Sequence, residues 1–188
     1  MQKLILKYIL AVIGKILLLP TVPFAAIFVA MFNKEEDPDH VRYRWGGIYG
    51  TFDNPPQGDN GYITKHAIFK NENKGFKGYV NRVMWMIRNP LYNYARYNGI
   101  EWKDSYTITQ EGNPDISDKY KVPGKLWTKA WDSKGRLVAF GFYMVKPWSK
   151  KRNLRMRIGW KVKSRAVKEQ GFIQMVFTIN PFDGYGND

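Results

Sequence analysis

The chain has 188 residues and a mass of 22.0 kDa, which fits one folded domain with an additional segment rather than two full domains. Its 30 Lys and Arg against 16 Asp and Glu give a formal net charge of +14, so it is suited to an anionic partner surface, or the charge serves solubility. Aromatic residues make up 16% of the chain and cysteine is absent, which excludes extended disorder, disulfides, thiolate metal sites and a cysteine nucleophile.

The stretch from Leu4 to Phe32 is almost entirely apolar and predicts a segment that contacts a membrane. Ten of its residues from Ile16 onward are Ile, Leu, Phe or Val, and at about −0.3 to −0.6 kcal/mol each they favour insertion by about 3 to 6 kcal/mol. As a helix this part reaches only about 25 Å against an apolar core of about 30 Å. A full span therefore extends back past Lys15, which costs about 2.5 to 3.5 kcal/mol at a helix centre.

Two geometries satisfy this pattern, and the sequence favours neither. In the first, a single kinked helix spans the bilayer and the Lys15 side chain reaches toward the headgroups. In the second, residues 3–18 form an amphipathic helix, Pro20 and Pro23 form an elbow, and residues 24–32 return to the same side. A cleaved signal peptide and a buried core hairpin are further alternatives. The predicted anchor residues are Leu4, Lys7, Lys15, Leu18, Pro20, Pro23, Phe24, Phe28 and Phe32.

An acidic, proline-containing run at residues 33–40 is typical of a linker. The predicted organisation is therefore a membrane-contacting segment at 1–32, the linker at 33–40 and a basic α+β domain at 41–188. The two histidines, His40 and His66, are not spaced as in a metal-binding motif. The acidic runs lack the pattern of a calcium loop. Neither a metal nor another cofactor is predicted.

A helix is predicted from Phe76 to Arg88, because apolar residues recur there at intervals of three and four. Asn89 and Pro90 end it, and a second short helix is expected at 91–97. We expect the apolar side to pack against a sheet; the alternative is that it lies against lipid headgroups beside the anchor. The residues of this side are Phe76, Tyr79, Val80, Val83, Met84 and Ile87.

Beyond Asn98 the apolar period changes to two, which predicts an antiparallel meander and an α+β fold. A hairpin turn is predicted at 132–135 and a flexible tail from Asp183. The predicted strands are 105–110, 125–131, 136–146, 154–163 and 172–179.

The strand at 154–163 alternates most clearly, with Leu154, Met156, Ile158, Trp160 and Val162 expected inside and its basic residues outside. From Lys146 to Glu169 the chain carries ten cations and one anion. Such a surface is either a solvated face or a binding surface for phosphate groups, worth about 1 kcal/mol per residue near an anionic membrane. The predicted anion-binding residues are Lys150, Lys151, Arg152, Arg155, Arg157, Lys161, Lys163 and Arg165.

No nucleophile elbow, phosphate-binding loop or paired carboxylate motif occurs in the sequence, so we expect neither an enzyme nor a small-molecule substrate. Nucleic acid is the main alternative to anionic membrane lipid as partner, because aromatic residues such as Trp148 and Trp160 lie among the basic ones.

Four stretches carry a resemblance to a known group: YVNRVMWMIRNPLY at 79–92, DNPPQGD at 53–59, GNP at 112–114 and NPF at 180–182. Together with the hydrophobic N-terminus they resemble uncharacterised small proteins of tailed bacteriophages and prophages. The resemblance implies a protein of the host inner membrane or a virion or genome-ejection component, with other phage proteins as possible partners. The basic domain would then lie on the cytoplasmic side.

Overall fold

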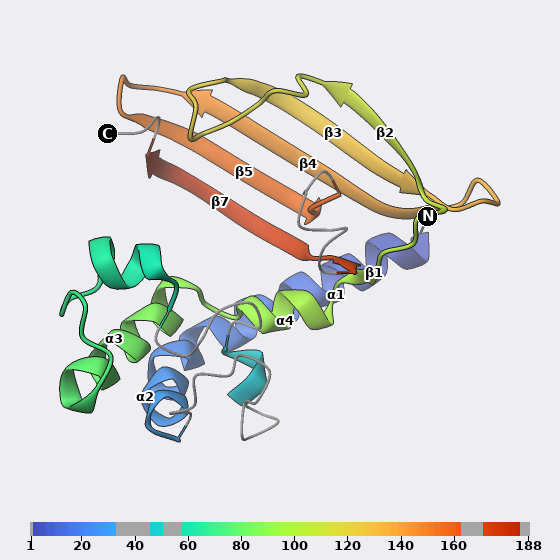
Figure 1. Ribbon diagram of the computed structural model, residues 1–188. Helices are drawn as coiled ribbons and strands as arrows, with labels where there is room; N and C mark the ends of the chain where they lie inside the picture. The colour runs from blue at the N-terminus through green and yellow to red at the C-terminus, as the bar shows by residue number, and fades with distance from the viewer. Residues whose placement is uncertain (1, 33–45, 51–57, 163–170, 185–188) are drawn as a thin grey trace. The chain divides into compact units, whose positions relative to one another are not determined.

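The computed structural model describes residues 2–32, 46–50, 58–162 and 171–184. It has the predicted α+β fold, with a long N-terminal helical run, further helices and antiparallel sheets (Figure 1). The helices are α1 (Gln2–Leu18), α2 (Val22–Phe32), α3 (Gly75–Arg88) and α4 (Tyr92–Tyr97), with short helical turns at Leu19–Thr21, Gly46–Ile48 and Tyr62–His66. The predicted helices at 76–88 and 91–97 correspond to α3 and α4 and are confirmed.

The main sheet has five antiparallel strands in the order β2-β3-β4-β5-β7, so the predicted meander is confirmed. A small two-stranded sheet pairs β1 (Ile100–Glu101) with β6 (Phe172–Ile173). The strands of the main sheet are β2 (Thr107–Gly112), β3 (Gly124–Trp131), β4 (Leu137–Pro147), β5 (Arg152–Trp160) and β7 (Met175–Gly184).

The hairpin turn between β3 and β4 is the predicted one. The Asp132 carboxylate accepts hydrogen bonds from the backbone N–H groups of Lys134 and Arg136, both at 2.9 Å, which holds the turn closed. Gly135 has a φ of 70°, a conformation that glycine adopts without a steric penalty. Local sequence therefore sets the register between these two strands.

The core of the sheet lies on the face that carries the arginines of β5. Leu126 and Val145 are 3% and 1% exposed and pack with Ile116 from the loop that joins β2 and β3. Val145 is paired with Arg155, and directly paired residues share a face. The prediction that Arg155 and Arg157 point to solvent is therefore wrong, because the loop carrying Ile116 covers this face.

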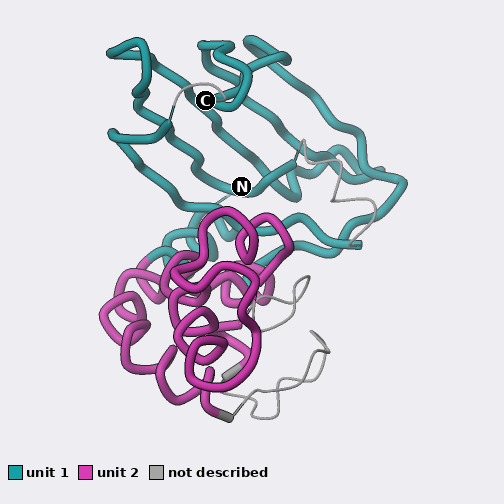
Figure 2. Tube along the Cα trace, turned by 60° about the vertical axis from the view of Figure 1, so that its left-hand side comes forward, with its two compact units in different colours: residues 1–12, 98–188 teal, residues 13–97 magenta. Residues whose placement is uncertain are grey.

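The chain divides into two compact units, one of residues 1–12 and 98–188 and one of residues 13–97 (Figure 2). The boundary lies within α1 and not at the predicted position after residue 32. The reason is that the start of α1 packs with the sheet: the Tyr8 hydroxyl donates to the Val176 carbonyl at 3.0 Å, and its ring contacts Phe140 and Trp160. The predicted linker at 33–40 lies outside the described residues.

In the helical unit α2 packs against α3. Ala26 and Ala30 are fully buried beside Met86, and their small side chains let the two helices approach closely. Side chains of α3 also bind late carbonyls of α2: the Tyr79 hydroxyl donates to Ile27 and Arg82 Nε donates to Ala30, both at 3.2 Å. We expected α3 to pack against a sheet, but in the structure it packs against α2.

The predicted apolar side of α3 is also not the buried one. Asn81 and Arg82 are buried together with Trp85 and Met86, whereas much of the apolar stripe is exposed. Burial of Asn81 is possible because its amide is fully hydrogen-bonded. Its Nδ2 donates to the carbonyls of Phe69 and Glu72 at 2.7 and 2.8 Å, and its Oδ1 accepts from the Phe69 N–H at 3.1 Å.

We predict that Asn81→Ala lowers the free energy of unfolding by about 2 to 4 kcal/mol, because three backbone groups lose their buried partner. Hydrogen exchange should also speed up at residues 66–73, which the Asn81 amide holds in place. Both are measurable on the full chain in mild detergent, by urea unfolding and by mass spectrometry. The control is Asn73→Ala, whose side chain is exposed. Equal stability of the two variants would contradict the role assigned to Asn81.

Candidate functional site

Helix α1 exposes most of its apolar surface. Only one stripe of the helix is covered, with Tyr8 and Ala11 buried and Leu4, Lys15 and Leu18 half-buried. The remaining sides carry large aliphatic residues, and a contiguous apolar surface of this kind is unusual for a protein in water. The exposed aliphatic residues are Ile5, Leu6, Ile9, Leu10, Ile13, Ile16 and Leu17.

Helix α2 continues the same arrangement. Val22, Ala26, Val29 and Ala30 are buried, and the large residues between them are exposed, with Phe24 at 70%. Together the helices give one run, Gln2–Met31, which is long and apolar enough to cross a bilayer, and only 17% of its most apolar window is buried. The other exposed residues described in α2 are Pro23, Ile27, Phe28 and Met31.

The predicted anchor residues fall on both sides of these helices. Lys15 is half-buried on the covered stripe, so its ammonium group does not have to face lipid. Lys7 is exposed, with Nζ 3.4 Å from the Gly99 carbonyl. Leu4 and Leu18 share the covered stripe with Lys15. Pro20, Pro23, Phe24 and Phe28 are exposed, and the side chain of Phe32 lies outside the described residues.

The prolines allow the helical run to continue. Pro20 stands at the start of a short 3-10 turn, where its missing N–H costs no hydrogen bond, and the flanking residues Leu18 and Val22 both have right-handed helical dihedral angles. Helix α2 then packs on α3. The spanning and the re-entrant geometries of the anchor both stay predictions.

Two of the predicted anion-binding residues are already paired within the protein. Arg155 Nη1 lies 2.7 Å from one oxygen of Asp118, and Arg157 Nη2 lies 3.4 Å from the other. The Tyr143 hydroxyl donates to Asp118 at 2.6 Å, and Arg155 Nη2 also binds Asp183 at 3.1 Å. These five residues form what we call the Asp118 network. Its two cations are balanced by two carboxylates, which leaves little attraction for an external phosphate.

The network shifts the pKa values of its acids in opposite directions. Burial disfavours ionisation of Asp118, but hydrogen bonds from Tyr143 and Arg155 and the charge of Arg157 outweigh it and lower its pKa to about 2. Burial raises the pKa of Asp183 above its ordinary value, against the opposing charge of Arg155. The network thus holds the loop after β2 and the end of β7 against β5.

Of the remaining predicted anion-binding residues, Lys161 donates to the side chain of Gln174 at 2.9 Å. Lys163 and Arg165 lie outside the described residues. Lys150 and Lys151 are exposed in the turn between β4 and β5, and Arg152 is exposed at the start of β5.

Two aromatic side chains lie at that turn, Trp148 within it and Phe182 in the neighbouring strand β7. Trp148 and Phe182 are 57% and 68% exposed, and their ring centroids lie 6.2 Å apart. Trp148 Nε1 donates to the Pro181 carbonyl at 2.7 Å, and Arg152 Nη1 donates to the Phe182 carbonyl at 2.9 Å. The accessible cations of the predicted set therefore lie beside exposed rings, a combination suited to a membrane interface or to unpaired bases.

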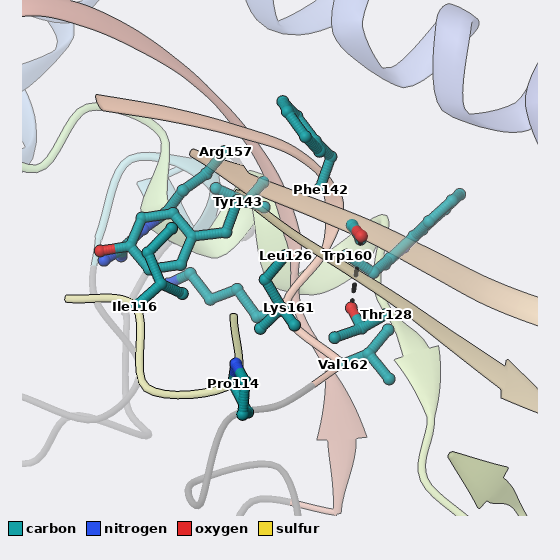
Figure 3. A pocket seen from close by; sticks show the side chains of 12 residues that line it. Pro114, Ile116, Leu126, Thr128, Phe142, Tyr143, Arg157, Trp160, Lys161 and Val162 are labelled. Atoms are coloured by element: carbon teal, nitrogen blue, oxygen red, sulfur yellow. Dashed lines mark hydrogen bonds between the residues drawn. The ribbon is translucent and has the colours of Figure 1, made fainter. Parts of the chain in front are cut away.

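A cavity of about 390 Å³ opens on the arginine face of the sheet (Figure 3). Ile116 and Tyr143 line one end and Val162 lines another part, whereas the rings of Phe142 and Trp160 point away from these side chains. Among the described residues that line it, Arg157 and Lys161 are the charged ones, and none is a carboxylate or an imidazole. The cavity can accommodate a small apolar group, but these residues offer no acid, base and nucleophile set.

Within residues 2–32, 46–50, 58–162 and 171–184, no cluster of three histidine or acidic side chains is placed to hold a metal ion. His66 is exposed, and His40 falls outside these ranges.

Sequence reasoning missed three members of the Asp118 network: Asp118, Tyr143 and Asp183. Asp118 lies 37 residues from Arg155, and no periodic pattern links them. The sequence predicts Asp183 in a flexible tail, whereas it lies in β7, which extends to Gly184. The signal to seek is a paired change of charge at these positions among related sequences. A single sequence does not reveal partners that lie so far apart.

We predict that Asp118 makes stability depend on pH at low pH. Because its pKa in the folded chain is about 2, below the ordinary 3.8, its contribution is fully present above pH 4 and is lost as the pH falls toward 2. By linkage this contribution is roughly 2 kcal/mol. Asp118→Asn should therefore be less stable at pH 7 and lose less stability on acidification than the unmodified chain.

The measurement is urea unfolding in mild detergent at pH 7 and at pH 3. The Asp118 charge helps to raise the pKa of Asp183, so the difference between the two proteins reports Asp118 together with its effect on Asp183. Asp115→Asn, an exposed acid of the same loop, is the control. Parallel pH profiles for Asp118→Asn and the unmodified chain would show that the network does not depend on the Asp118 charge.

Comparison with known proteins gives one family match. A family model described as a family of unknown function, DUF7338, matches residues 1–187. Neither a curated protein nor a solved structure matches the chain significantly.

Proposed function

The chain belongs to DUF7338, a family of unknown function, and for it we propose a non-enzymatic, membrane-associated role in which α1 and α2 contact lipid. The tailed-phage resemblance of residues 79–92 and the other quoted stretches extends this proposal to an interaction or structural protein at the host inner membrane or in the virion. Other phage proteins are the expected assembly partners.

The observation that carries the proposal is the distribution of residues around α1. Its covered stripe contains the polar residues Tyr8 and Lys15, whereas every exposed residue from Ile9 to Leu17 is Ile or Leu. A helix in water has the opposite distribution. Exposed aliphatic surface is costly in water, at about 25 cal/mol per Å², and favourable in a bilayer. The arrangement is therefore suited to lipid on one side and protein on the other.

The contacts of Tyr8 support an anchor that is retained rather than a signal peptide that is cleaved. Its hydroxyl binds Val176 and its ring packs against Phe140 and Trp160, so removal of the first residues would expose apolar surface of the sheet unit. Signal peptides function without such contacts to the mature chain.

For the electrostatic contact with anionic lipid we propose Lys150 and Lys151 of the turn and the adjoining Arg152. These side chains are exposed, whereas Arg155 and Arg157 are neutralised in the Asp118 network. Each cation adds about 1 kcal/mol near an anionic surface. The exposed ring of Trp148 in the same turn is of a kind enriched at headgroup depth.

Nucleic-acid binding in a virion or ejection apparatus is the alternative, and the same turn favours it. Exposed cations beside Trp148 and Phe182 are suited to phosphate contacts and base stacking. The alternative leaves the apolar sides of α1 and α2 unexplained, which is why we rank it second.

We predict that Leu17→Lys weakens binding of the full chain to vesicles of phosphatidylcholine and phosphatidylglycerol by about 100-fold. Leu17 is 71% exposed near the middle of the apolar run, where replacing leucine with lysine costs about 3 kcal/mol. Vesicle flotation measures the effect. The control is Tyr120→Lys, which places the same charge on an exposed residue, 67% accessible, in a loop of the sheet unit.

The unmodified chain should float with these vesicles and remain bound in part at high salt, because the anchor is apolar. A chain that stays monomeric without detergent and ignores both neutral and anionic vesicles would eliminate the membrane role. Salt-sensitive binding to single-stranded DNA by that same chain would then favour the alternative.

A further inference from the structure

Helix α3 turns an apolar stripe away from the protein. Phe76 is 75% exposed, and Met84 and Ile87 are 37% and 36% exposed, with the half-buried Val80 between them. Met84 and Ile87 follow Phe76 by eight and eleven residues, so the three side chains lie along one side of the helix. The helix is amphipathic, but its buried side is not the side that carries this apolar stripe.

The covered side of α3 is complete without this stripe. Trp85 packs with Tyr62, and Met86 packs with the alanines of α2. Asn81 and Arg82 fill the rest of that side and are hydrogen-bonded to carbonyls of neighbouring segments. Among the described residues of the helical unit, nothing buries Phe76, Met84 and Ile87.

The stripe is continuous with the exposed side of α2. Met31, at the end of α2, and Phe76, at the start of α3, line the same open hollow of about 600 Å³, together with Tyr79 and Arg82. Met31 is 45% exposed. The surface that α2 offers to lipid under the proposed function thus extends onto α3 within one compact unit.

Positive charge borders the stripe. The segment at 65–77 carries four exposed lysines and one acid, Glu72, which pairs with Lys77 at 3.1 Å. Lysines beside an apolar stripe are the pattern of helices that lie in the headgroup layer of an anionic bilayer. A protein partner would need an apolar surface bordered by acids, whereas anionic lipid provides both features. The four lysines are Lys65, Lys70, Lys74 and Lys77.

We propose that α3 is a second membrane-contacting element, lying in the interface of an anionic bilayer with Phe76, Met84 and Ile87 among the acyl chains and the lysines of 65–77 at the headgroups. This inference rests on the proposed function, since it requires the chain to meet a membrane. It differs from that function in making the helical unit, and not the apolar N-terminus alone, the membrane-binding surface.

The chain contains no cysteine, so single labelling sites can be introduced one at a time. Phe76→Cys and Met84→Cys are labelled with an environment-sensitive nitrobenzoxadiazole dye and mixed with vesicles of phosphatidylcholine and phosphatidylglycerol. We expect a blue shift, and quenching by lipids brominated on the acyl chain. Leu17→Cys is the positive control in α1, and Tyr120→Cys is the exposed control in the sheet unit.

The outcomes separate the two proposals. A response at Leu17→Cys with none at Phe76→Cys and Met84→Cys overturns the role of α3 and leaves the anchor intact. No response at any site, with no flotation, overturns both. A shift at positions 76 and 84 that appears without vesicles and grows with protein concentration assigns the stripe to a second copy of the chain and also overturns the inference.

A second measurement uses unlabelled protein. Phe76→Ser combined with Ile87→Ser should lower affinity for anionic vesicles by at least about tenfold, since two large side chains no longer enter the bilayer. Tyr120→Ser should leave it unchanged. Unaltered hydrogen exchange at residues 66–73 verifies that the double variant is folded, and unaltered affinity in a folded variant contradicts the inference.

Discussion

The structure depends on the placement of polar side chains toward the protein and of aliphatic side chains away from it. In α1 the covered stripe holds Tyr8 and Lys15, and in α3 the covered side holds Asn81 and Arg82. Each of the hydroxyl, amide and guanidinium groups finds a carbonyl partner, such as Ala30 for Arg82. A bilayer offers no water to satisfy such groups, so this distribution is stable where the outer medium is lipid.

The same arrangement gives the apolar N-terminus two tasks. It is a structural helix, because Tyr8 completes the apolar packing around Phe140 and Trp160, and it is the proposed anchor, because its other sides are aliphatic. The basic residues likewise fall into two groups, those paired within the protein and those exposed to a partner. Two of the 30 basic residues, Arg155 and Arg157, are paired with Asp118 and Asp183, and the net charge of +14 already counts these two acids. The basic residues of β5 that can bind a partner are therefore fewer than the sequence alone implies.

Much of the fold was predictable because local pattern decides it. The change of period after Asn98 predicted the meander, and Asp132 with Gly135 predicted the turn between β3 and β4. The candidate site was predictable only in part. The apolar run at the N-terminus was identified, but the covered stripe through Lys15 was not, and the arginines of β5 were assigned to solvent because Asp118 lies far away in the sequence.

By itself the sequence determined the helices α3 and α4 and most of the main sheet, that the N-terminus is apolar and that the chain is basic. The tertiary structure decided which side of each helix is covered and which cations are already paired. The physical reason is that periodicity defines an apolar side without specifying the medium it faces. For α3 the pattern of Phe76, Met84 and Ile87 is the same for a core and for a membrane. Only the packing of α2 on the opposite side distinguishes them.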